Sequence, residues 1–242
     1  MKLPVPHPRF FGISLWLIAP LALLLAYCGG GGGSSSSPPA APNPPVIAAL
    51  LFGFPAGAAP GNFPNALVAV VDSTTGAALT NATVTINGAP LFFNGAPTNN
   101  EFEGTVLVNP GDPVTLVVSV NGQVYSASGM QPTTYPTITA PASGATWSFA
   151  NANTVTWTAG APLAGAAYLV GVLNASFPIG SPAYFAAASS SATSLVIPAS
   201  LLTPGNRILI VGLTLPPIAV SNAYPGSLFI PGGFNYVPIL VN

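Results

Sequence analysis

One cysteine and four carboxylates carry most of the reactive chemistry in this chain of 242 residues. Cys28 stands between an apolar run and a glycine-serine tract, and we interpret it as a point of covalent attachment. The carboxylates are Asp72, Glu101, Glu103 and Asp112. In "NNEFEG", Glu101 and Glu103 are two residues apart, so on a strand they share a face and could act as a glycosidase acid and base. We favour the alternative, a solvated strand edge protected by charge.

Basic side chains are almost confined to the start of the chain, where Lys2, His7 and Arg9 stand; the only later one is Arg207. Without residues 1–27 the charge is +1 − 4 = −3, with no lysine and no histidine. This part of the chain therefore lacks the histidine that Ser-His-Asp triads and Cys-His pairs need, and the lysine that Schiff bases and P-loops need. The chain has too few cysteine and histidine residues for a usual zinc site and no Asp-rich loop of the kind that binds calcium. It also has no basic patch of the kind that binds nucleic acid. We therefore expect no enzyme activity, no cofactor, no metal and no nucleic-acid partner.

The first 27 residues have the layout of an export signal. A positive start precedes an uncharged, mostly apolar run, "FFGISLWLIAPLALLLAY", as in secretory signals. The run is slightly shorter than the ~20 residues of a comfortable membrane span, and Pro20 interrupts its helix. An uncleaved membrane helix with an incidental thiol is the alternative. Both interpretations place the rest of the chain outside the cytoplasm.

The segment Leu25-Ala26-Tyr27-Cys28 resembles the bacterial lipoprotein signal, with matches at Leu25, Ala26 and Cys28. Tyr27 stands where the family has a small residue. The resemblance implies cleavage before Cys28 and acylation of this residue with fatty acids such as palmitate, on the outer membrane of a bacterial envelope. Residues 1–27 are then the signal peptide. Residues 28–45 are the lipidated cysteine and a flexible Gly/Ser/Pro tether.

From Pro45 onward, local patterns predict short strands separated by turns. In "DPVTLVVSVNGQVYSAS", valine and leucine alternate with other residues, and Asn121-Gly122 forms a favoured hairpin turn. "NATVTINGAP" repeats the pattern with Asn87-Gly88. Strands with these turns indicate a β-sandwich. The predicted fold class is all-β: two tandem Ig-like sandwiches, at 46–131 and 132–242, after an N-terminal signal helix and a linker.

Each predicted sandwich also resembles a known family. "VAVVDSTTGAALTNATVTING" resembles the carboxypeptidase-regulatory-like or Cna-B-like family, which implies an Ig-like fold and no catalysis. "TITAPASGATWSFANANTVTWTAG" resembles fibronectin-III-like or cell-wall Ig-like modules, and here we expect Trp157 in the core. At the later corner, fibronectin-type domains place a tyrosine about where Ile208 stands. The matching residues are Asp72, Thr75, Gly76, Leu79, Ala82 and Val84 for the first family, and Pro141, Gly144, Trp147, Val155 and Trp157 for the second.

These features favour a non-enzymatic, lipid-anchored envelope protein of structural or binding type. Its expected partners are the membrane, through the anchor, and envelope proteins or polysaccharide. Arg207 would solubilise the surface or pair with a carboxylate of the first sandwich. The alternative function is a carbohydrate-binding module that stacks sugars on exposed aromatic rings. The candidate ligand-binding residues are Trp147, Tyr184, Phe185, Tyr224 and Phe234. For most of them, Trp147 included, we favour a packing role.

Overall fold

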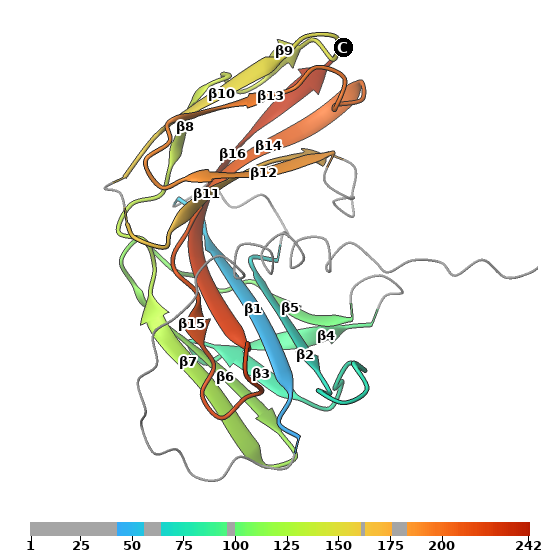
Figure 1. Cartoon of the computed structure of the whole chain (residues 1–242), viewed down its shortest axis with the longest axis vertical. Helices are drawn as coiled ribbons and strands as arrows, with labels where there is room; N and C mark the ends of the chain where they lie inside the picture. Colours follow the sequence, from blue (N-terminus) through green and yellow to red (C-terminus); the bar gives the residue numbers. More distant parts are fainter. Residues whose placement is uncertain (1–42, 56–63, 96–99, 161–162, 176–182) are drawn as a thin grey trace, which may run out of the picture.

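The computed structural model describes residues 43–55, 64–95, 100–160, 163–175 and 183–242. All regular secondary structure within these ranges consists of β-strands, which confirms the predicted all-β class. Figure 1 shows two strand-rich bodies joined by one long strand, β16 (Leu228–Val241). We call the body that contains β1 the N-module and the other the C-module.

The N-module is a strand assembly that almost closes on itself. Its strands follow the order β16-β1-β2-β5-β4-β3-β6-β7, and β15 pairs with β16. A bridge between Ser126 in β7 and Ser221, just after β15, brings the two ends of this order together. The strands are β1 (Val46–Gly53), β2 (Ala66–Val71), β3 (Thr83–Ile86), β4 (Ala89–Asn94), β5 (Glu101–Gly104), β6 (Pro113–Val120), β7 (Gln123–Met130) and β15 (Ile218–Ala219).

The C-module is an Ig-like sandwich of two sheets. One sheet has the order β12-β11-β14-β16, with β9 parallel to the end of β16, and the other has the order β13-β10-β8. Trp157 lies between the sheets, 2% exposed and 5.3 Å from the ring of Tyr168, as predicted for a core residue. The strands are β8 (Thr137–Ala140), β9 (Ala145–Trp147), β10 (Asn153–Thr158), β11 (Ala167–Asn174), β12 (Tyr184–Ser189), β13 (Ser194–Ile197) and β14 (Gly205–Thr214).

Strand β16 belongs to both modules. Over Leu228–Gly233 it pairs in parallel with β1, and over Gly232–Val241 it pairs antiparallel with β14. Phe229 and Ile239 are ten residues apart and therefore share one face of the strand. Because they lie near its opposite ends, Phe229 enters the N-module core while Ile239 enters the C-module core. The cores therefore do not follow the predicted ranges 46–131 and 132–242 at the end of the chain, since the segment from β15 to Phe229 completes the N-module.

Local patterns explain the strands on each side of the two turns. The four apolar residues Val114 to Val120 that alternate along β6 are all buried. Each removes a side chain from water, a gain of about 1.5–3 kcal/mol for a fully buried residue. Asn87-Gly88 and Asn121-Gly122 both have positive φ at the two residues, the backbone of a type I′ hairpin turn. The predicted turns are thus confirmed.

A third apolar cluster lies where the modules meet. Its buried members come from β1, β11 and β16, on the faces of these strands that point away from the two main cores. Phe52 and Phe234 form its centre, with ring centroids 4.2 Å apart in an edge-to-face contact. The shared sheet is therefore apolar on both faces at the junction. The buried members are Leu50, Phe52, Leu169, Ile230 and Phe234.

Candidate functional site

The predicted lipidation residue, Cys28, lies outside the described residues, as do residues 1–27. The described chain begins at Asn43, and β1 starts three residues later, where the predicted tether ends. The carbonyl of Pro45 accepts a hydrogen bond from the backbone N–H of Tyr224, at 2.9 Å. This bond fixes the end of the tether to the turn before β16. In the described part of the chain, nothing helical is long and apolar enough to cross a membrane.

The five aromatic candidates for sugar binding do not form one surface. Trp147 is 7% exposed and belongs to the C-module core, while Phe234 is 4% exposed in the junction cluster. Tyr184 is half-buried on the C-module core, and Phe185 is half-buried at the junction. Only Tyr224 is well exposed, at 46%, in the N-module turn. Burial therefore rules out a stacking role for Trp147 and Phe234, and the packing role favoured for Trp147 is confirmed.

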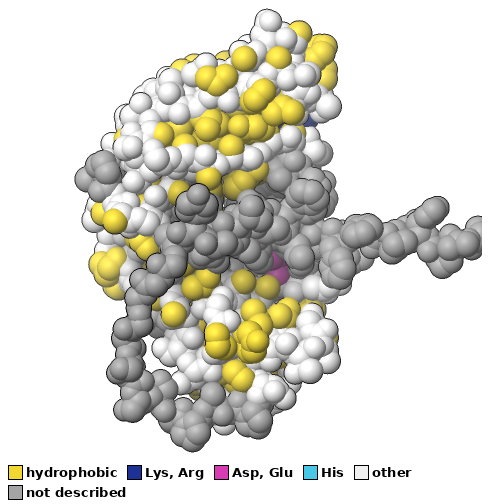
Figure 2. All heavy atoms as spheres, viewed as in Figure 1, with side chains coloured by type: hydrophobic (Ala, Val, Ile, Leu, Met, Phe, Trp, Pro, Cys, Tyr) yellow, Lys and Arg dark blue, Asp and Glu magenta, His cyan; other side chains and the backbone are white. Residues whose placement is uncertain are grey.

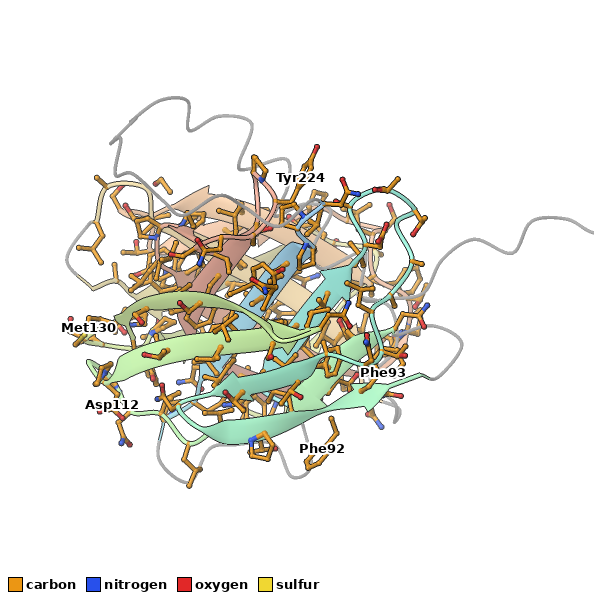
Figure 3. The ribbon with its side chains drawn as sticks, turned by 90° about the horizontal axis from the view of Figure 1, so that it is seen from below. Phe92, Phe93, Asp112, Met130 and Tyr224 are labelled. Carbon is orange, nitrogen blue, oxygen red and sulfur yellow. The ribbon has the colours of Figure 1, made fainter. Side chains whose placement is uncertain are left out.

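Two exposed phenylalanines were not among the predicted ring candidates. Phe92 in β4 is 71% exposed, and Phe149 in the loop after β9 is 44% exposed. Alternation along "PLFF" was the available signal, because Leu91 is buried and its neighbour must then face outward. Figure 3 shows Phe92 and Tyr224 on opposite sides of the N-module. These rings therefore do not combine into one platform either.

Two aspartates stabilise turns. A carboxylate oxygen of Asp72 accepts bonds from the backbone N–H groups of Thr74 at 2.9 Å and Thr75 at 2.7 Å, and from the Thr75 hydroxyl at 3.0 Å. These bonds, led by that from the Thr75 backbone, lower the pKa of Asp72 below its ordinary value. Asp112 accepts bonds from the backbone and side-chain nitrogens of Asn109, at 2.7 and 3.0 Å. Both carboxylates therefore act as local caps of turns.

Glu101 and Glu103 flank Phe102, whose ring is buried in the N-module core, so they share the opposite face as predicted. The expected solvated edge is wrong, however, because β5 lies between β2 and β4 and Glu101 is only 3% exposed. Glu103 is half-buried and accepts a bond from the Asn94 side-chain nitrogen at 3.1 Å. The two glutamates thus lie inside a sheet.

Arg207 ties a loop of the C-module. Its Nη2 donates to the carbonyl and hydroxyl oxygens of Thr203, both at 2.7 Å, and to the carbonyl of Pro204 at 3.0 Å; Nη1 donates to the carbonyl of Asn206 at 3.0 Å. The side chain is 8% exposed. Arg207 neither coats the surface nor pairs with a carboxylate within the described ranges. Its guanidinium therefore ties the corner at the start of β14.

The chain between the modules contributes a tyrosine that packs on two glycines. Gly53 in β1 and Gly233 in β16 are register partners, and the ring of Tyr135 lies where a Cβ atom on either would stand. Any larger residue at these positions would overlap the ring. Burial, and secondarily the charge of Asp112, raise the pKa of Tyr135 to about 12. Tyr135 thus packs against β1 and β16 where the two modules meet.

The polar chemistry of the described residues is spread over the molecule. They contain no group of three histidine, cysteine or acidic side chains that could hold a metal ion. Figure 2 shows a viewed face with apolar patches over both modules and little acidic or basic surface among the described atoms. The arrangement suits packing and contact through backbone and apolar groups.

No family model matches the chain, and no curated protein matches it either. Among solved structures, the chain is similar to the fibronectin(III)-like modules of CbhA from Clostridium thermocellum, with 11% identity and a TM-score of 0.26. That alignment covers 73% of this chain and 84% of the other. At this TM-score the similarity carries no weight for function. The Ig-like assignment depends on the strand order given above.

Proposed function

We propose that the chain is a non-enzymatic, lipid-anchored protein of a bacterial cell envelope that holds two β-sandwich modules at the end of a tether. The observation that carries the proposal is the sequence around Cys28. An apolar run, a single cysteine and a glycine-serine-proline tract follow one another, and β1 begins at Val46 where that tract ends. Two acyl chains or more on one cysteine would give stable membrane attachment.

The roles of the polar residues support a structural or binding function without catalysis. Asp72 and Asp112 cap turns, and Arg207 ties a corner. A catalytic carboxylate pair should face a space that admits substrate, but Glu101 is buried within a sheet whose neighbours are β2 and β4. We infer that Glu101→Gln leaves glycan hydrolysis at the level of the unaltered protein.

Metabolic labelling with radioactive palmitate tests the anchor. We expect label on the wild-type chain and none on Cys28→Ser, which also keeps residues 1–27 and therefore migrates more slowly on a gel. Ser35→Ala, in the same tether, is the matched control and should label like the wild type. Equal labelling of the Cys28→Ser variant, or no label on the wild-type chain, would contradict the proposal.

We do not extend the proposal to carbohydrate binding. Within the described ranges, exposed rings occur singly: Tyr224 and Phe92 on opposite sides of the N-module, and Phe149 in a loop of the C-module. A sugar platform gains affinity from rings that contact neighbouring sugar units together. A polysaccharide pull-down should therefore show no retention of the protein.

A further inference from the structure

Strand β12 is the edge of the large sheet in the C-module. It pairs with β11 through six consecutive residues, Tyr184–Ser189 opposite Ala167–Val172, with no interruption of register. On its other side, β12 has no strand partner among the described residues. The backbone N–H and C=O groups on that side are of the kind that another strand can bind.

The other sheet edges in the described ranges are covered or short. The edge of β7 is met by Ser221, whose backbone N–H donates to the carbonyl of Ser126 at 2.8 Å, and by Ile218 against Gly129. In the small sheet, β13 has four residues. β8 also has four, and its pairing with β10 shifts register. Edges of these kinds resist pairing with another chain.

Strand β12 has none of the usual protective features. Its sequence "YFAAAS" contains no charge and no proline, and its register shows no bulge. Ala187 and Ser189 are exposed and small, so another backbone can approach closely. Natural sheets protect a long free edge with lysine, proline or a bulge. An unprotected edge of six residues therefore indicates a surface that is covered by another strand.

We propose that β12 pairs antiparallel with β12 of a second copy of this chain, about a two-fold axis. An antiparallel pair of identical strands is self-complementary, as a two-fold interface requires. Charge favours this occupant: all four carboxylates lie in the N-module, and the only charged side chain of the C-module, Arg207, is bonded inside its own corner. Two C-modules can thus meet through β12 without repulsion, and the β12-β11-β14-β16 sheet continues across both chains.

Disulfide cross-linking of the full chain in a bacterial host that exports it tests the pairing. Ala187→Cys and Ser189→Cys place a thiol on the exposed side of β12. The matched control is Val124→Cys, on the exposed face of β7 at 54% exposure. The wild-type chain, with Cys28 alone, gives the background. Because only residues near a two-fold axis face their own copies, a single variant cross-links only if its position lies near the axis. We therefore expect a band at twice the chain mass on a non-reducing gel for at least one of Ala187→Cys, Ser189→Cys and the double variant that carries both, and no such band for Val124→Cys.

A second measurement does not depend on thiol geometry. In sedimentation of the detergent-purified protein, the wild type should have the mass of two chains, Ala187→Lys the mass of one, and Val124→Lys the mass of two. The lysines on paired strands would lie close together and repel. A wild-type mass of one chain would overturn the proposal. So would equal cross-linking at Val124, or a β12 adduct whose mass shows a different protein.

Discussion

The N-module and the C-module differ in how they close their sheets. The N-module brings its two edges together through β15 and Ser221, and it needs the last strand of the chain to do so. The C-module holds its part of β16 through ten residue pairs with β14 and leaves β12 at an edge. The module that comes first in the sequence therefore depends on a strand from the end of the chain. The open edge lies in the module with fewer charges.

Removal of β16 should have the largest effect on the stability of both modules. A chain that ends at Ser227 lacks the partner of both β1 and β14, so neither core can close. We expect complete loss of protease resistance in both modules. If residues 46–131 alone withstood digestion, the N-module would be independent of β16 and the comparison would fail.

The second prediction compares the two ends of β16. Phe229→Ala empties a fully buried site in the N-module core, and Ile239→Ala does so in the C-module core, at 0% and 3% exposure. We expect each to lower the free energy of unfolding by about 2–5 kcal/mol. Because β16 couples the cores, hydrogen exchange should speed up in both modules for each variant. Exchange that changed only in the mutated module would show that the cores are uncoupled.

Arg207 gives a smaller effect that is confined to the C-module. Arg207→Met removes donors from three carbonyl groups in the corner, and a buried polar group left without a partner costs about 1–3 kcal/mol. Arg207→Lys keeps the charge but not the forked geometry, and it should recover only part of the loss. Denaturant unfolding measures both variants. Equal stability of the Met variant and the wild type would show that the corner does not need the guanidinium.

The smallest predicted effect concerns Tyr135 at alkaline pH. Its pKa is about 12 in the folded chain against an ordinary 10, so between these values the unfolded chain releases a proton that the folded chain keeps. Stability therefore falls as pH rises through this interval. Tyr135→Phe removes this contribution, and its melting temperature should fall less between pH 10 and pH 12. A parallel decline in the two proteins would contradict the raised pKa.

Patterns within one strand or turn predicted much of the fold. The alternation in β6, the two Asn-Gly turns and the core position of Trp157 need only neighbouring residues to be recognised. The pairing of β1 with β16 joins residues about 180 positions apart, and Pro231, Gly232 and Gly233 interrupt any local strand signal. No periodicity in the sequence identifies such a partner.

The candidate site was predicted less well, for a different reason. Residue type alone does not decide whether an aromatic ring is a core residue or an exposed one, and Trp147 and Phe234 both proved to be buried. The role of Arg207 depends on where the carbonyls of one loop point, which the sequence does not show. The edge position of β12 likewise follows from strand order and not from its composition.

Differential scanning calorimetry of the purified protein tests most directly the claim that β16 makes the two modules one unit. We predict a single transition whose calorimetric and van't Hoff enthalpies agree, as for a cooperative fold. Two separate transitions, or a calorimetric enthalpy well above the van't Hoff value, would show that the modules unfold independently despite the shared strand.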